Sequence, residues 1–135
     1  MSEFFSAAWL ALREPYDRAA RNGAVLDAVS TAFVAAAAAT VTDLGCGTGA
    51  TLRAVAPCLP ARQNWRLVDN DKALLDRALL EVVTGIPAGV RVTAVAADLV
   101  VALEAALGDC DLVTTSALLD LVSAPWLDRL VARLV

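Results

Sequence analysis

The chain contains no histidine and has few cysteines. The absence of histidine excludes Ser-His-Asp and Cys-His hydrolases and histidine-ligated metal sites, and it removes the commonest general base at neutral pH. The three cysteines, Cys46, Cys58 and Cys110, are odd in number and widely spaced, so they indicate neither a disulfide framework nor a zinc ribbon. This cysteine content fits a protein of a reducing compartment, and no metal site is expected. Any chemistry must therefore rely on carboxylates, backbone amides or a cofactor with its own reactivity.

Charged residues are also scarce, at 19% of 135 residues, and eleven basic residues face fifteen acidic ones. The net charge of −4 has the wrong sign for a chain that binds phosphates by releasing counterions, so we do not expect nucleic acid as a direct partner. The longest stretch without charge, between Asp27 and Asp43, is shorter than the roughly 20 residues that cross a bilayer. The first residues lack the positive flank of a secretory signal. We therefore expect a cytoplasmic protein without membrane association.

Apolar residues make up 59% of the chain, and its length is enough for one hydrophobic core. Residues 1–40 show two helical stripes, with an expected interruption at Glu14-Pro15. The stripes consist of Phe5, Trp9 and Leu12, then Leu26, Val29 and Phe33. A run of alanines over residues 35–39 extends the second helix or links it onward. The first forty residues are therefore interpreted as a helical segment.

From residue 41 onward, short apolar segments alternate with helical stretches. The predicted strands are Val41–Leu44, Trp65–Val68, Val90–Val95 and Leu112–Thr115. Helix boundaries are indicated at Pro57, Asp71, Gly108 and Ser123. This alternation predicts an α/β fold, a Rossmann-like parallel sheet with helices on both faces. We expect the Rossmann-like domain to occupy residues 41–135.

The strongest chemical motif is a strand that runs into a glycine-rich turn and then a helix, Val41-Thr42-Asp43-Leu44-Gly45-Cys46-Gly47-Thr48-Gly49. Glycines allow a sharp turn and a close approach of a ligand to the backbone. Gly45, Gly47 and Ala50 also satisfy the GxGxxA pattern, which keeps an NAD-binding oxidoreductase domain open as an alternative. Asp43 disfavours it, because a buried carboxylate repels a pyrophosphate. A ligand with positive charge and hydroxyl donors suits the turn better.

The segment from Asp43 to Gly49 resembles the first motif of the class I S-adenosylmethionine-dependent methyltransferases, and later segments follow that family's order. Val68-Asp69 is similar to the family's acidic ribose-binding position, Ala97-Asp98-Leu99 to its adenine-binding motif, and Asp111 to Ser116 to its fourth strand. The resemblance implies methyl transfer with S-adenosyl-L-methionine as the cofactor. The cofactor-binding residues that it implies are Asp43, Gly45, Cys46, Gly47, Gly49, Asp69, Asn70, Asp98, Leu99 and Ser116.

Each implied role has a physical basis. The Asp69 carboxylate can accept hydrogen bonds from both ribose hydroxyls. Asp98 can accept from the adenine amine while the Leu99 amide donates to a ring nitrogen, and Asp43 would face the cofactor's ammonium group, directly or through water. Considered alone, Asp69 and Asp98 also suit helix caps, and Cys46 suits space filling.

Two departures from the family pattern limit what is carried over. Asn70 stands where the family commonly has an apolar residue over an adenine face. Residues 114–117 lack the Asn/Asp-Pro-Pro-aromatic signature of amino-group methyltransferases, so the resemblance implies no particular methyl acceptor.

A sulfonium makes its methyl group electrophilic already, so methyl transfer requires alignment of the acceptor rather than a dedicated catalytic side chain. Residues considered for acceptor contact or for closing over the cofactor are Ser116, Asp120, Tyr16 and Arg18.

Four predicted strands are fewer than the seven of a class I methyltransferase sheet. In that family's order, third-second-first-fourth, the last strand lies at an edge with Leu112 and Val113 uncovered. Because an apolar edge invites pairing, we expect a truncated domain, or cover by a second copy of the chain or by the amino-terminal helices. Besides the methyltransferase and the oxidoreductase, a non-catalytic module that binds cofactor weakly or acts through assembly stays open.

Overall fold

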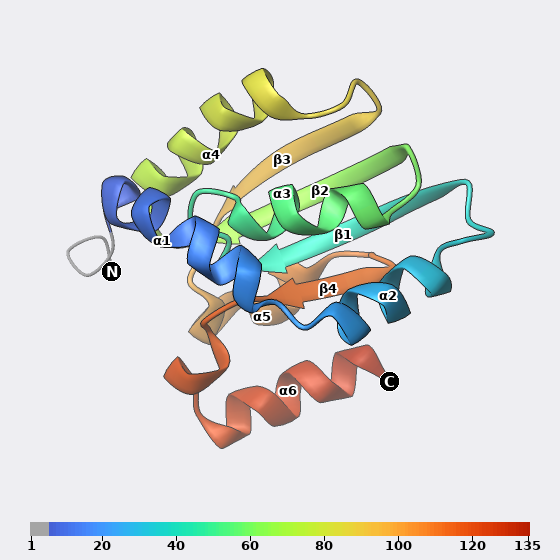
Figure 1. Ribbon diagram of the computed structural model, residues 1–135. Coiled ribbons are helices and arrows are strands. Elements are labelled where there is room, and N and C mark those ends of the chain that lie inside the picture. The colour runs from blue at the N-terminus through green and yellow to red at the C-terminus, as the bar shows by residue number, and fades with distance from the viewer. Residues whose placement is uncertain (1–5) are drawn as a thin grey trace.

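The computed structural model describes residues 6–135, and Figure 1 shows a parallel sheet surrounded by helices. The strands are β1 (Ala38–Leu44), β2 (Arg62–Asp69), β3 (Val90–Ala96) and β4 (Leu112–Thr115). The helices are α1 (Ala7–Ala20), α2 (Gly23–Ala32), α3 (Ala50–Val55), α4 (Lys72–Gly85), α5 (Leu99–Leu107) and α6 (Ala124–Leu134), with 3-10 turns η1 (Ala56–Cys58) and η2 (Leu119–Leu121). The described strands pair in parallel in the order β3-β2-β1-β4. The predicted fold class and strand order are confirmed.

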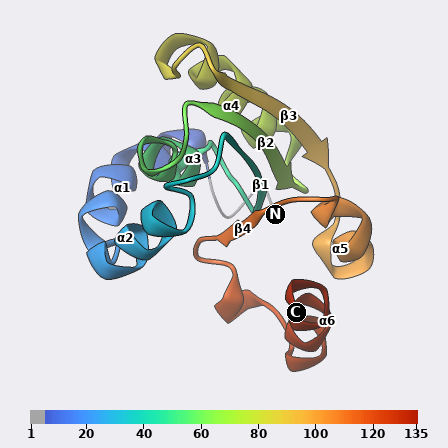
Figure 2. The same ribbon diagram turned by 90° about the vertical axis from the view of Figure 1, so that its right-hand side faces the viewer.

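Alternating side chains place apolar residues on both faces of the sheet, as a parallel sheet between helices requires. Trp65 and Leu67 of β2 pack with α3 and α4 in one core, whereas Val68 packs with α5 and α6 in the other. Figure 2 shows α1, α2 and α3 on one side of the sheet and α5 and α6 on the other. Arg66 lies two residues from Val68 and therefore on the same face of the sheet. Its Nε donates to the Ala106 carbonyl of α5 at 2.8 Å. Among residues 6–135, no helix is long and apolar enough to cross a membrane.

Helix α1 continues through Pro15, so the expected interruption at Glu14-Pro15 was wrong. A proline inside a helix removes one backbone hydrogen bond and crowds the preceding turn. Here two ion pairs span the proline: Arg13 pairs with Asp17 and Arg18 pairs with Glu14, each at a spacing of four residues. Such pairs stabilise neighbouring turns of a helix by about 0.2–0.5 kcal/mol each, so they offset a small part of the proline's cost of about 3 kcal/mol.

The other elements begin and end close to the predicted residues. The alanine run links onward rather than extending α2, because α2 ends at Ala32 and the run's last residues, Ala38 and Ala39, already belong to β1. Pro57 lies in η1, directly after α3. The helix boundaries predicted at Asp71, Gly108 and Ser123 are confirmed. Phe5, in the first predicted stripe, lies outside the described residues.

Strand β4 pairs with β1, and within residues 6–135 its other edge has no strand beside it. Its two apolar side chains are nevertheless partly buried. Leu112 packs against the core that contains α3 and α4, and Val113 packs against the core that contains α5 and α6. The backbone edge is therefore open within these residues, although the two cores partly bury Leu112 and Val113. The expected truncation, or cover by a second copy of the chain, stays a prediction.

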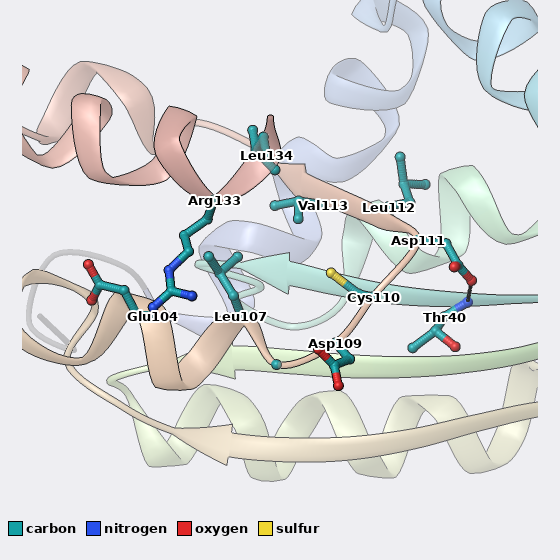
Figure 3. Close-up of a pocket in the computed structure, with 11 residues that line it drawn as sticks. Thr40, Glu104, Leu107, Asp109, Cys110, Asp111, Leu112, Val113, Arg133 and Leu134 are labelled. Atoms are coloured by element: carbon teal, nitrogen blue, oxygen red, sulfur yellow. Dashed lines mark hydrogen bonds between the residues drawn. The ribbon is translucent and has the colours of Figure 1, made fainter.

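A cavity of about 550 Å³ lies along this edge, at the amino-terminal end of β4 and therefore opposite the glycine turn. Figure 3 shows that Asp109 and Asp111 point apart, with Asp111 directed at Thr40. The Thr40 amide donates to Asp111 Oδ2 at 2.9 Å. The Asp111 carboxylate thus joins the loop before β4 to strand β1.

Candidate functional site

The glycine turn between β1 and α3 uses its own backbone amides for internal hydrogen bonds. The amides of Gly45 and Cys46 both donate to the Val68 carbonyl of β2, at 2.8 and 3.0 Å. The amide of Gly47 donates to Asp69 Oδ2 at 2.9 Å. Gly47 has a φ of 55°, a left-handed conformation that residues with side chains rarely adopt. These three successive amides are therefore engaged and are not free donors for a phosphate, whereas α3 begins after Gly49 without a side-chain cap.

Asp69 ends β2 and joins the glycine turn to the start of α4. Its Oδ2 accepts from the Gly47 amide, and its Oδ1 accepts from the Asp71 amide at 2.9 Å. The N-cap of α4 is Asp71, which accepts from the Ala73 and Leu74 amides. Asp69 is therefore not a helix cap. A carboxylate offers about four acceptor sites, so Asp69 retains the capacity to accept further donors.

A second cavity, of about 440 Å³, opens at the carboxyl ends of the strands beside Asp69. This is the usual ligand position in an open parallel sheet. Seven of the ten predicted cofactor residues line it: Gly45, Gly47, Asp69, Asn70, Asp98, Leu99 and Ser116. Asp98 also caps α5, because its Oδ1 accepts from the Val100 amide at 2.9 Å. One side chain thus combines a cap with a place in the cavity wall.

Asp43 does not line this cavity. It is buried on β1, where Thr114 Oγ1 donates to its Oδ1 at 2.8 Å, while its Oδ2 has no hydrogen-bond partner among the described residues. Burial raises the pKa of Asp43 to about 7, although the Thr114 hydrogen bond and the Arg21 guanidinium favour the charged form. Asp43 therefore lies inside the protein rather than in the cavity wall.

Cys46 and Gly49 are also absent from the cavity wall. Cys46 is buried, and desolvation together with the charges of Asp43 and Asp69 raises the pKa of its thiol. Little thiolate therefore exists at neutral pH, which favours space filling over a nucleophilic role. Gly49 precedes α3 with a φ of 91°, and a Cβ there would lie 3.4 Å from Arg53 Nη1. Both residues shape the turn.

Helix α1 contributes to the cavity in a way that the sequence interpretation missed. Leu10 and Arg13 line the cavity, and Leu10 Cδ1 lies 3.4 Å from the position of a Cβ on Gly47. Tyr16 and Arg18, considered for closing over the cofactor, do not line it: Tyr16 is 77% exposed and Arg18 bonds Glu14. The spacing of three residues between Leu10 and Arg13 puts them on one helix face, a signal that could have identified them.

The segment after β4 supplies much of the remaining wall, namely Ser116, Ala117, Leu118, Leu121, Val122 and Trp126. Among the described residues, Ala117 is the one non-glycine residue with a left-handed backbone, at a φ of 54°. Such a conformation costs about 1–3 kcal/mol and is typical of ligand-binding sites. Leu118 covers Gly45, with Cδ1 3.5 Å from the position of a Cβ. Leu10 and Leu118 therefore cover the turn, while Gly45 and Gly47 still line the cavity.

Trp126 and Asp120 of this segment differ in burial. Trp126 is buried, and its Nε1 donates to the Leu99 carbonyl at 2.7 Å. Asp120, considered for acceptor contact, is exposed in η2 and does not line the cavity. The apolar neighbours of Asp120, not its carboxylate, form the wall at this point.

An ion-pair network fastens α1 beside the glycine turn. Arg53 of α3 donates to both carboxylate oxygens of Glu14 of α1, at 2.8 and 2.6 Å, and pairs with Glu81 of α4 at 3.1 Å. It also donates to the Thr48 carbonyl at 2.9 Å. The Arg53 hydrogen bond lowers the pKa of Glu14. One side chain thus joins three helices and the turn.

Replacing Arg53 with methionine is expected to lower the free energy of unfolding by about 1–3 kcal/mol, because Glu14 and the Thr48 carbonyl lose a charged partner. Urea unfolding followed by tryptophan fluorescence measures this loss. The loss should shrink as the pH falls below 4.5, the ordinary pKa of glutamate, because the folded-state pKa of Glu14 is lower. Lys72→Met is the matched control, since its pair with Asp76 is largely exposed and worth less than about 1 kcal/mol. Equal effects of the two substitutions would contradict the anchoring role of Arg53.

The strand order β3-β2-β1-β4, the glycine turn after β1 and the acidic residues after β2 and β3 define a class I methyltransferase domain. Residues 41–135 match the protein family described as a methyltransferase domain, and the chain belongs to this family. A comparison with curated proteins finds no match.

Two solved structures share the fold. A protein of Methanococcus maripaludis, assigned as an S-adenosyl-L-methionine-dependent methyltransferase, matches with a TM-score of 0.57 and 17% identity, over 81% of this chain and 48% of its own. A dimethyladenosine transferase from Plasmodium falciparum matches with a TM-score of 0.50 and 19% identity, over 83% of this chain and 38% of its own. Identities this low show a common fold alone. The chain spans less than half the length of either protein.

Proposed function

We propose that this chain binds S-adenosyl-L-methionine and takes part in methyl transfer from it to an acceptor. The observation that carries the proposal is the cavity of about 440 Å³ in which a glycine turn with engaged amides meets the carboxylates of Asp69 and Asp98. This part of the wall presents carboxylate acceptors beside a glycine backbone whose amides at Gly45 and Gly47 are already engaged. It therefore suits a ligand that itself brings hydroxyl, amine and positively charged groups.

The adenosine part of the cofactor suits the acidic side of the cavity. Asp69 would accept from the ribose hydroxyls with the acceptor sites that Gly47 and Asp71 leave free. Asp98 would accept from the adenine amine, and the Leu99 side chain lies in the wall with it. Asn70 adds a polar amide to this part of the wall. These assignments use residues from the ends of β2 and β3, which finish at the same edge of the sheet.

The unpartnered oxygen of Asp43 supports the fit of the cofactor's positive end. A buried carboxylate oxygen without a donor is costly, so a donor or cation near it is favourable. Because Asp43 does not line the cavity, the ammonium group would reach it through water. An ionised Asp43 also favours a cation over a phosphate at the turn. The residues present therefore fit S-adenosyl-L-methionine.

When bound, S-adenosyl-L-methionine supplies an electrophilic methyl group, so the chain's own residues need to bind, orient and exclude water. The apolar part of the wall is formed by Leu10, Leu118, Leu121 and Trp126. Ser116 presents a hydroxyl at the end of β4, and we place the acceptor's approach there. We assign no general base to this chain.

The same geometry disfavours a dinucleotide. A pyrophosphate at this turn requires free backbone amides, whereas the amides of Gly45, Cys46 and Gly47 already donate within the protein. An ionised Asp43 adds repulsion. These two observations favour the methyltransferase over the NAD-dependent oxidoreductase.

Calorimetric titration with S-adenosylhomocysteine and, separately, with NAD tests the proposed function. We expect S-adenosylhomocysteine to bind and NAD to give no heat, because the turn offers engaged amides and acidic side chains. Heat with NAD alone would overturn the proposal in favour of the oxidoreductase. Heat with neither ligand would overturn it in favour of a non-catalytic assembly module.

A further inference from the structure

Arg13 is the one basic side chain among the described residues that line the cofactor cavity. Three aspartates, Asp69, Asp71 and Asp98, line it as well. Arg13 lies about one helical turn after Leu10, which contacts the glycine turn at Gly47. Figure 1 shows α1 beside the carboxyl ends of β1 and β2. The positive charge of the cavity wall therefore lies on the side of the glycine turn.

The Arg13 guanidinium is held in place from two directions. The Nε and Nη2 of Arg13 donate to the carboxylate of Asp17 at 2.8 and 3.1 Å. The Cζ of Arg13 lies 4.8 Å from the centre of the Trp9 ring, a cation–π arrangement. These contacts leave Nη1 available to a ligand. Because the side chain is ordered before a ligand arrives, it loses less conformational entropy when it binds an anion.

Resting on the proposed function, the geometry points to Arg13 as the residue that binds the carboxylate at the amino-acid end of the cofactor. The adenosine part is assigned to Asp69 and Asp98, so the amino-acid end lies along the glycine turn toward α1. That end carries a carboxylate, which would lose hydration and meet repulsion in a wall whose other charged residues are aspartates. Arg13 offsets both effects, because a planar guanidinium forms strong charge-assisted hydrogen bonds to carboxylates.

This assignment makes Arg13 a residue that selects the intact cofactor over adenosine compounds without the amino-acid end. The probes are S-adenosylhomocysteine and 5′-methylthioadenosine, which retains the adenosine and the sulfur but lacks the amino-acid end. Calorimetry on the full chain compares the two ligands. We expect Arg13→Met to weaken S-adenosylhomocysteine binding by about 10- to 100-fold and to change 5′-methylthioadenosine binding by less than about twofold.

Two further variants test whether the charge of Arg13, at its place in the cavity wall, is responsible for the effect. Arg13→Lys retains the positive charge, so it should bind S-adenosylhomocysteine more tightly than Arg13→Met does. This variant keeps the test informative even if Arg13→Met folds poorly. Arg18→Met removes the same charge from α1 at a residue outside the cavity wall. We expect Arg18→Met to leave the affinities for both ligands within about twofold of the parent.

The outcomes separate this inference from the proposed function. Equal weakening of both ligands by Arg13→Met would assign Arg13 to the packing of α1 and overturn the inference. Unchanged affinity for S-adenosylhomocysteine in that variant would overturn it as well. In either case the proposed function stands, because the parent chain binds both ligands. If the parent chain binds neither, the proposed function itself fails, and the role of Arg13 fails with it.

Discussion

Asp69→Ala is expected to abolish measurable binding of S-adenosylhomocysteine, an affinity loss of at least about 100-fold. The carboxylate would accept from two ribose hydroxyls, and each charge-assisted hydrogen bond contributes about 1.5–3 kcal/mol. The substitution also releases the amides of Gly47 and Asp71, which donate to this carboxylate at 2.9 Å. The glycine turn then loses its attachment to the end of β2. Calorimetric titration of the folded variant measures the loss.

Two variants separate the ribose contact from the support of the turn. Asp69→Asn keeps one side-chain acceptor for an amide but removes the charge, so it should retain the fold and still lose most of the affinity. Asp76→Ala on α4 removes an exposed carboxylate paired with Lys72 and should leave binding within about twofold of the parent. An Asp69→Ala chain that is folded by circular dichroism and retains the parent's affinity would contradict the assignment.

The affinity for S-adenosylhomocysteine is expected to fall as the pH drops below about 7, because burial raises the pKa of Asp43 to about 7. Below that pKa the carboxyl is neutral and no longer attracts an ammonium group. If binding requires the ionised form, the affinity falls by up to about tenfold for each pH unit. Titrations from about pH 5.5 to 8 measure this dependence.

Two substitutions test whether Asp43 is the titrating group. Asp43→Asn removes the carboxyl, so binding should be weak and should no longer depend on pH in this range. Thr114→Val removes the hydrogen bond that favours the charged carboxylate. It should therefore raise the pKa of Asp43 further and move the loss of affinity to higher pH. A parent chain whose affinity is constant from about pH 5.5 to 8 would rule out this role.

Asp43 also predicts a pH dependence of the unliganded protein's stability. Its folded-state pKa lies above the ordinary value of 3.8. Between these values the unfolded state binds fewer protons than the folded state, so rising pH destabilises the fold, and the cost persists above about 7. The stability of Asp43→Asn relative to the parent should therefore increase by at least about 1 kcal/mol between about pH 4 and 8. Urea unfolding of both proteins at a series of pH values measures the difference.

Short-range patterns were sufficient to predict the sheet and most helix boundaries. The caps at Asp71, Asp98 and Ser123 act on amides within three residues of themselves, so the neighbouring sequence encodes them. The acids at the end of β2 and after β3 were expected to meet because parallel strands end at one edge of the sheet. Both Asp69 and Asp98 line the same cavity, as that argument predicts.

Contacts between segments far apart in the sequence could not be predicted from these short-range patterns. The bond between Glu14 and Arg53 joins residues 39 positions apart, and it holds α1 where Leu10 and Arg13 complete the cavity wall. Asp43 was expected to face the cofactor, but its burial depends on β4, where Thr114 lies 71 positions away. The alternation of a strand tells which face a side chain occupies, not what covers that face.

The amino-acid sequence by itself therefore determined the fold class and the presence of a glycine turn with acidic residues at strand ends, whereas the order of the strands was implied by the family resemblance. These features depend on local conformational preferences and on the common direction of parallel strands. Only the tertiary structure decided that the turn's amides are engaged internally, that Asp43 is enclosed, and that α1 and the segment after β4 complete the cavity. The reason is physical: burial, and with it the pKa of a carboxyl or the availability of an amide, depends on every element that packs around a group.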